Sequence, residues 1–171
     1  AANTAIALAK GGEQTLLIDF DLRKPVQHNL FGVNNTGIAE VLSGLCRPDE
    51  VISSTPISNL CLVPSGYATS NPAELLASPQ TRKIINIFKS KADILVFDTP
   101  PVLPIVDTCI LSPYADGIIL VISVGLTRPA AVTKAKESLL RAGGRILGVV
   151  INRGSFEIEQ SMYCQYFNGS R

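Results

Sequence analysis

Five short apolar runs punctuate this sequence, and none of them alternates polar with apolar residues. Such a run is typical of a strand that is covered on both faces of its sheet. The runs lie at 15–18, 60–63, 94–97, 118–124 and 146–151. Stretches that predict helices precede or separate them, at 1–10, 38–42, 81–89, 105–111 and 129–141. This alternation predicts an α/β fold with a mostly parallel, doubly wound sheet.

The rest of the chain gives no sign of a second domain. It contains neither an internal repeat nor a low-complexity tract, and 171 residues suit a single domain. We expect 46–59 and 64–79 to be long surface connections, and 155–171 to be a C-terminal tail. No apolar run approaches the roughly 20 residues that a bilayer span needs, and no signal peptide is visible. A cytosolic domain is therefore expected.

Charge and cysteine content disfavour two classes of function. Fifteen basic and 14 acidic side chains leave a net charge of +1, which gives no overall field to attract nucleic acid. The four cysteines are scattered and accompany a single histidine, so zinc ligands lack both number and spacing. We interpret the cysteines as buried or idle thiols.

Two acidic residues follow the first predicted strand. Asp19 and Asp21 come at its carboxyl end, and Arg23-Lys24-Pro25 follows at once. Ligands of open parallel sheets bind at this end of the strands, and a cation such as Mg²⁺ would relieve the repulsion between the two carboxylates. A solvated turn explains this stretch equally well when it is taken alone, because Asp is common in turns.

The strand predicted at 94–97 also ends in an acidic residue, Asp98, and Pro100-Pro101 follows it. Phosphoryl-transfer sites need carboxylates to hold Mg²⁺ or its waters, because the chemistry depends on positioning and charge neutralisation. Two strands that both end in Asp therefore favour a Mg²⁺–nucleotide site. Asn152, after the last strand, carries an amide that could pair with a base edge, although a turn role is commoner for such an Asn.

A phosphate-binding P-loop, G-x-x-x-x-G-K-[ST], is absent from the sequence. No Gly-Lys dipeptide occurs in it, and Lys10-Gly11 has the opposite order. A predicted helix nevertheless lies directly before the first acidic strand, where the helix of a P-loop would run. We interpret the chain as a P-loop-type domain that lacks its first strand and its P-loop through truncation.

Across nearly its whole length the sequence resembles the bacterial tyrosine autokinases of capsule and exopolysaccharide biosynthesis, which are related to the partitioning-type, deviant Walker ATPases. The start at 1–9 resembles the residues that follow the GKST of that family, and 16–25 resembles its D-x-D-x-R-K/R-P motif. The segments 71–76 (N-P-A-E-L-L) and 98–102 (D-T-P-P-V) resemble further family motifs, as do 37–44, 62–66 and 148–152. The R-K-P and N-P-x-E-L-L elements distinguish these kinases from the partitioning ATPases.

This resemblance implies an ATP- and Mg²⁺-dependent kinase that phosphorylates tyrosines in its own C-terminal cluster. Asp98 would be the Walker B carboxylate near Mg²⁺, and Asp19 would lie nearest the metal and accept the tyrosine proton. Asp21 would be the second carboxylate of its motif. Two further residues would bind the cofactor: Asn152 would touch adenine, and Arg23 would lie among the cofactor-binding groups. Tyr163 and Tyr166 would accept the phosphate.

The same resemblance implies partners and a location. The family's domains form rings of identical subunits and are activated by a membrane polysaccharide copolymerase, either fused or separate. The protein would then act in the cytoplasm, at the inner face of the cell membrane. Two other functions stay open: an ATPase switch of the partitioning type without a protein substrate, and a non-catalytic interaction subunit that has no P-loop.

Overall fold

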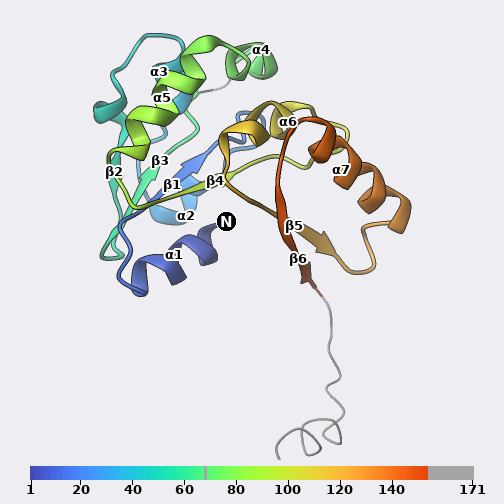
Figure 1. Cartoon of the computed structure of the whole chain (residues 1–171). Helices are drawn as coiled ribbons and strands as arrows, with labels where there is room; N and C mark the ends of the chain where they lie inside the picture. Colours follow the sequence, from blue (N-terminus) through green and yellow to red (C-terminus); the bar gives the residue numbers. More distant parts are fainter. Residues whose placement is uncertain (68, 154–171) are drawn as a thin grey trace, which may run out of the picture.

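A computed structural model describes residues 1–67 and 69–153. It contains two sheets, one mostly parallel and one parallel, with helices packed around them (Figure 1). The five predicted strands are confirmed, each to within one residue: β1 (Thr15–Asp19), β3 (Leu60–Val63), β4 (Ile94–Asp98), β5 (Ile118–Ser123) and β6 (Ile146–Asn152). The predicted helices are confirmed with small changes at their ends: α1 (Ala2–Lys10), α3 (Ile38–Leu42), α5 (Pro79–Lys89), α6 (Asp107–Leu111) and α7 (Pro129–Arg141).

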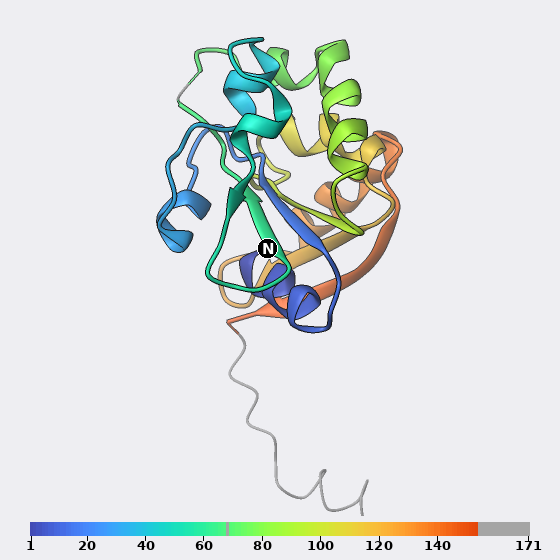
Figure 2. The ribbon, with the colours of Figure 1, turned by 90° about the vertical axis from the view of Figure 1, so that its left-hand side faces the viewer.

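The four-stranded sheet has the order β2-β3-β1-β4, and β1 lies parallel to both β3 and β4. β2 (Ser53–Ser54) pairs antiparallel with β3 at one edge. β1 is buried along its whole length, as its apolar sequence predicted. Leu16 and Ile18 pack on one face, in the core formed with α3, α4 and α5, whereas Leu17 packs on the other with Ala5 and Ala9 of α1. Helices therefore cover both faces of this sheet (Figures 1 and 2).

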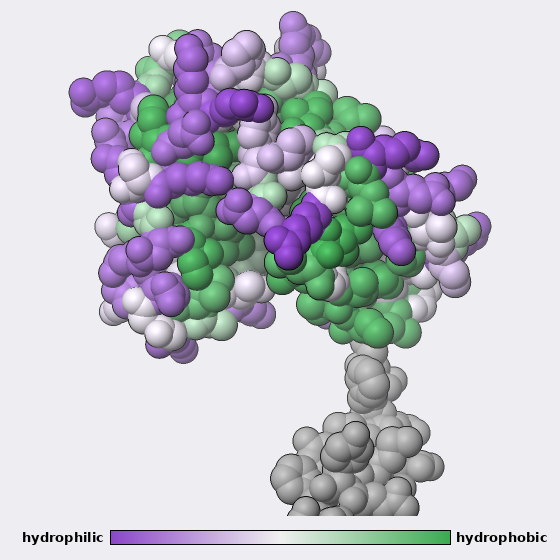
Figure 3. Space-filling view, viewed as in Figure 1, coloured by the Kyte–Doolittle hydropathy of each residue, from purple (hydrophilic) through white to green (hydrophobic). Residues whose placement is uncertain are grey.

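The strands of the chain do not form one continuous sheet. Within the described residues, β4 pairs only with β1, and β5 pairs only with β6. β4 and β5 therefore each keep one edge without a strand partner. Several apolar side chains of β5 and β6 are about half exposed, including Ile119 (51%), Val121 (58%) and Val149 (52%). Figure 3 shows apolar residues gathered over this part of the surface.

The segments expected to be irregular contain short elements. Residues 46–59 include a 3₁₀ helix, η1 (Pro48–Val51), and the strand β2, while residues 64–79 include α4 (Pro72–Leu76). Two more short elements were not predicted: α2 (Gln27–Phe31) and the 3₁₀ helix η2 (Ser112–Tyr114). Each spans at most five residues.

The motif segments 37–44 and 62–66 contact each other at the start of α3. The backbone N–H of Ile38 donates to the carbonyl of Pro64 at 2.8 Å. Glu40 accepts hydrogen bonds from the N–H of Gly37 at 2.7 Å and from that of Tyr67 at 2.9 Å, and so holds the helix and the loop together. A Cβ at Gly37 would overlap the carbonyl of Pro64. This close approach explains why a glycine stands there.

Candidate active site

Asp19 and Asp98 lie side by side at the carboxyl ends of adjacent parallel strands. The two residues are partners in the β1–β4 register, and the N–H of Phe20 donates to the Asp98 carbonyl at 2.8 Å. Asp19 is fully buried, whereas Asp98 is partly exposed. The structure thus brings together the two residues that the sequence proposed as metal ligands.

Three backbone N–H groups donate to the Asp19 carboxylate. Oδ1 accepts from Asp21 at 3.1 Å, and Oδ2 accepts from Val26 at 3.3 Å and from Gln27 at 3.1 Å. Burial nevertheless raises the pKa of Asp19 from 3.8 to about 6, and the negative charge of Asp98 acts in the same direction. The hydrogen bonds oppose this rise because they favour the ionised form. The surroundings of Asp19 therefore destabilise its ionised form, and a bound cation would stabilise that form.

Gln27 connects the two carboxylates, and sequence analysis did not single it out. It is 4% exposed and begins α2. Its backbone N–H donates to Asp19, and its side-chain Nε2 donates to Oδ2 of Asp98. Its Oε1 is buried and has no hydrogen-bond partner in the described part of the chain. Gln27 lies eight positions after Asp19, and nothing in the sequence indicates that the chain returns there to the carboxyl edge of the sheet.

Asp21 shapes the loop that follows β1. Its Oδ1 accepts hydrogen bonds from the N–H groups of Arg23 at 3.1 Å and Lys24 at 2.9 Å. Side-chain-to-backbone bonds of this kind are common for Asp in turns. The turn role that the sequence left open for this stretch is thus present at Asp21. Its catalytic role stays a prediction.

The guanidinium of Arg23 forms a two-pronged ion pair with Asp107 at the start of α6. Nε donates to Oδ2 at 2.8 Å, and Nη2 donates to Oδ1 at 3.0 Å. The Asp107 side chain is fully buried, while that of Arg23 is 38% exposed. The pair fastens the loop after β1 to the segment after β4. Arg23 therefore has a structural partner in addition to its predicted cofactor role, and the sequence gave no sign of Asp107.

Asn152 belongs to a different sheet from Asp19 and Asp98. It ends β6, in the two-stranded sheet, and is exposed. Its Oδ1 accepts a hydrogen bond from the N–H of Arg153 at 2.9 Å, and its backbone carbonyl accepts one from Val124 at 3.0 Å. Contact with adenine stays a prediction. The predicted acceptors Tyr163 and Tyr166 lie outside the described residues.

The two carboxylates and the free amide oxygen of Gln27 fit the chemistry of Mg²⁺. This cation takes one or two protein carboxylates and completes its shell with water and phosphate oxygens. Within residues 1–67 and 69–153, no group of three or more His, Cys, Asp or Glu residues could hold a metal by itself. The protein groups of the site should therefore hold a cation only weakly until a nucleotide adds its phosphate oxygens.

Comparison with known proteins identifies relatives of the chain. The AAA domain family matches residues 1–132. The chain is 34% identical over 166 residues to the putative tyrosine-protein kinase CapB of Staphylococcus aureus, covering 96% of this chain and 73% of CapB. It is 39% identical over 153 residues to the tyrosine-protein kinase YwqD of Bacillus subtilis, covering 89% of this chain and 65% of YwqD.

The chain belongs to the bacterial tyrosine-kinase family.

Its fold agrees with a solved structure of this family. The crystal structure of the chimerical protein CapA2B2 superposes with a TM-score of 0.85 at 33% identity, and the match covers 90% of this chain and 68% of that one. The predicted fold class, a mostly parallel sheet of the P-loop type, is thus confirmed. The chain spans about two thirds to three quarters of the length of these kinase relatives.

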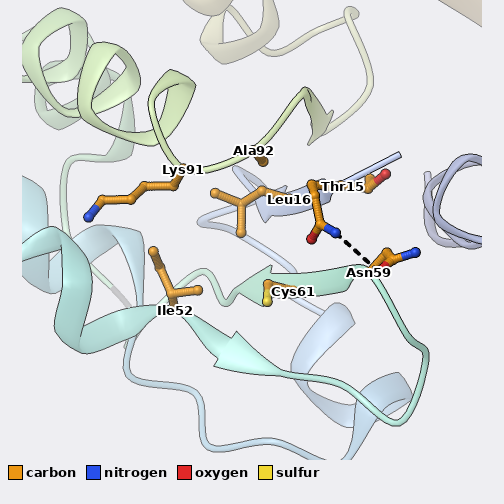
Figure 4. Close-up of a pocket in the computed structure, with 8 residues that line it drawn as sticks. Thr15, Leu16, Ile52, Asn59, Cys61, Lys91 and Ala92 are labelled. Atoms are coloured by element: carbon orange, nitrogen blue, oxygen red, sulfur yellow. Dashed lines mark hydrogen bonds between the residues drawn. The ribbon is translucent and has the colours of Figure 1, made fainter. Parts of the chain in front are cut away.

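Two motifs that distinguish these kinases share one hollow of the surface. A cavity of about 380 Å³ is lined by Arg23 of the R-K-P element and by residues 70–74, which include the start of N-P-x-E-L-L. Another pocket, of about 200 Å³, lies at the opposite, amino-terminal end of the strands (Figure 4). Thr15, Leu16 and Cys61 line it, and the carboxylate pair is not among its residues. We therefore place the candidate active site at the carboxyl edge.

Proposed function

We propose that this chain is the central part of an ATP-dependent protein-tyrosine autokinase that regulates exopolysaccharide or capsule polymerisation and export. The observation that carries the proposal is the in-register pair Asp19 and Asp98 at the carboxyl edge of the sheet. Relatives that are named tyrosine-protein kinases support the choice of phosphoryl transfer to tyrosine.

In this proposal Asp98 and Asp19 hold Mg²⁺. When bound, Mg²⁺ would neutralise charge on the phosphate oxygens of ATP. Asp19, with a pKa of about 6, is mostly ionised at neutral pH and can accept the proton of an attacking tyrosine. Asp21 supports the loop after β1, because its carboxylate accepts hydrogen bonds from two backbone N–H groups of that loop. The Arg23–Asp107 ion pair holds that loop in place.

A kinase of this type also needs backbone amides and a lysine around the phosphates. No Gly-Lys dipeptide supplies them within these 171 residues. We propose that a strand bearing a P-loop completes the site in the working protein. In the part of the chain that the structure describes, β4 and β5 each have an edge without a strand partner. These edges are suitable places for such a strand, because a parallel strand there would end at the same edge as Asp98.

The remaining assignments belong to the same proposal. Asn152 contacts adenine, and Tyr163 and Tyr166 accept phosphate from a neighbouring subunit of a ring. A membrane copolymerase activates the kinase at the inner face of the membrane. No helix in the described part of the chain is both long and apolar enough to cross a bilayer.

Autophosphorylation is the decisive test. We expect the chain as given to show no saturable ATP binding at millimolar nucleotide, and the chain with a family-type P-loop segment joined before Ala1 to incorporate phosphate in a Mg²⁺-dependent way. Asp98→Asn and Asp19→Asn should each lower the rate by about two orders of magnitude or more, because transition-state charge stabilisation is lost. Exposed Asn29→Ala is the matched control and should keep the full rate.

The site of phosphorylation separates the alternatives. Mass spectrometry should find phosphate on Tyr163, Tyr166 or tyrosines further along the intact protein. Phosphate mainly on Tyr67, Tyr114 or serine would contradict the tail-autokinase proposal. ATP hydrolysis without phosphotyrosine would favour the ATPase switch, and neither activity would favour the interaction subunit.

A further inference from the structure

Gln27 is held at two points beside the carboxylate pair. Its backbone N–H donates to Oδ2 of Asp19 at 3.1 Å, and its Nε2 donates to Oδ2 of Asp98. The residue is 96% buried. Its backbone donor and one of its side-chain donors are therefore both bonded to the two residues that the proposed function assigns to Mg²⁺.

The orientation of the side-chain amide follows from these contacts. Nε2 faces a carboxylate oxygen, which can only accept while it is ionised. A flipped amide would place Oε1 against that oxygen, so that two acceptors would repel each other. Oε1 must therefore point away from Asp98 Oδ2. It does so as a buried acceptor without a donor among the described residues, an arrangement that costs free energy in a folded protein.

An unpaired buried acceptor next to two carboxylates points to a donor that arrives with the ligand. An anion at Oε1 is excluded, because this acceptor oxygen would repel it. Mg²⁺, in contrast, usually keeps several of its waters when it binds protein. A water on Mg²⁺ is a strong donor, because the cation polarises it. Groups behind the direct ligands orient those ligands in metal sites and tune the affinity.

We infer that Gln27 is a positioning residue of the Mg²⁺–nucleotide site: its Nε2 fixes the Asp98 carboxylate, and its Oε1 accepts a hydrogen bond from a cation-bound water. This inference rests on the proposed function. It differs from a purely structural role, in which Gln27 would only fasten α2 to β4. A fastening role needs the donor but gives no use for the free oxygen.

The test titrates Mg²⁺ alone into the chain and follows NMR signals of the Asp98 carboxyl and the Gln27 side-chain amide. In the wild type both signals should shift and saturate together in the millimolar range. Gln27→Met, which keeps the size and removes both hydrogen-bonding groups, should weaken Mg²⁺ binding by about tenfold. Asn29→Ala, two positions along the same helix and exposed, should bind Mg²⁺ like the wild type.

A second variant covers the case in which Gln27→Met fails to fold. Gln27→Asn keeps both groups on a shorter side chain, and it should also weaken Mg²⁺ binding while the circular dichroism stays that of the wild type. In the P-loop-completed protein, Gln27→Met should raise the Mg²⁺ concentration for half-maximal rate by about tenfold. A change in kcat alone would contradict the inference.

The outcomes separate this inference from the proposed function. Wild-type saturation combined with affinities in the folded Gln27 variants within twofold of the wild type would overturn the role of Gln27 and leave the metal site intact. If the Asp98 signal of the wild type does not respond to Mg²⁺ at all, the metal assignment itself is wrong, and the inference falls with it.

Discussion

Replacing Asp19 by Asn should change how the stability of the chain depends on pH. The pKa of Asp19 is about 6 in the folded chain against an ordinary value of 3.8, mainly because the carboxyl is buried. The folded state therefore binds this proton more tightly than the unfolded state does. The stabilisation from Asp19 is fully present below pH 3.8 and is lost as the pH rises through about 6.

The size of the effect follows from the two pKa values. The difference between 3.8 and about 6 corresponds to about 3 kcal/mol, at about 1.4 kcal/mol for each pKa unit. Part of this amount is already lost at pH 4, where the unfolded carboxyl is mostly ionised. Between pH 4 and pH 7, Asp19 alone should therefore lower the free energy of unfolding by about 2.4 kcal/mol. Ionised Asp19 is costly because burial outweighs the three N–H groups that donate to it.

Urea unfolding of the wild type and of Asp19→Asn, both in EDTA, measures this contribution from pH 4 to pH 8. Other carboxyl groups titrate in the same range, and taking the difference between the two proteins cancels them. Over this range the variant should gain about 2.4 kcal/mol relative to the wild type as the pH rises. A difference that stays constant within about 0.5 kcal/mol would refute the raised pKa.

Two other substitutions test contacts that position the site. Gly37→Ala should destabilise the chain by about 2 kcal/mol, because the new Cβ would overlap the carbonyl of Pro64; chemical denaturation measures this, and Gly148→Ala, with open space around its Cβ position, should stay within about 0.5 kcal/mol. Asp107→Asn should lower the urea midpoint, because it breaks a buried two-pronged ion pair. Arg47→Ala, which breaks an exposed pair, should leave the midpoint unchanged, and equal effects of the two changes would contradict this assignment.

The strands and the carboxylate pair could be predicted because their causes are local. An unbroken apolar run predicts a buried strand, and parallel strands end at one edge of a sheet. The positions of Asp19 and Asp98 at the ends of two strands were therefore enough to predict that they lie close together. The long helix α7 was equally plain, since Pro129 begins it and Ala135 and Leu139 form its buried stripe.

The partners of these residues could not be predicted, because they depend on how the chain returns in space. Gln27 reaches Asp98 across 71 positions of sequence, and Asp107 reaches Arg23 across 84. Asp107 stands at the start of a short helix, where an acidic residue ordinarily faces solvent. No spacing rule marks it as fully buried. The division of the strands into two sheets likewise follows from pairing, which a list of apolar runs does not contain.

The division into two sheets also bears on how cooperatively the chain unfolds. β1 has strand partners on both sides and is buried throughout. Among residues 1–67 and 69–153, β5 and β6 pair only with each other, and Val121 and Ile151 are more than half exposed. Segments with few buried apolar contacts open at lower free energy than the core does. The β5–β6 unit should thus open as a separate cooperative unit, and its amide hydrogens should exchange with solvent well before those of β1. Joining a strand to the free edges of β4 and β5 would merge the two units into a single unfolding transition.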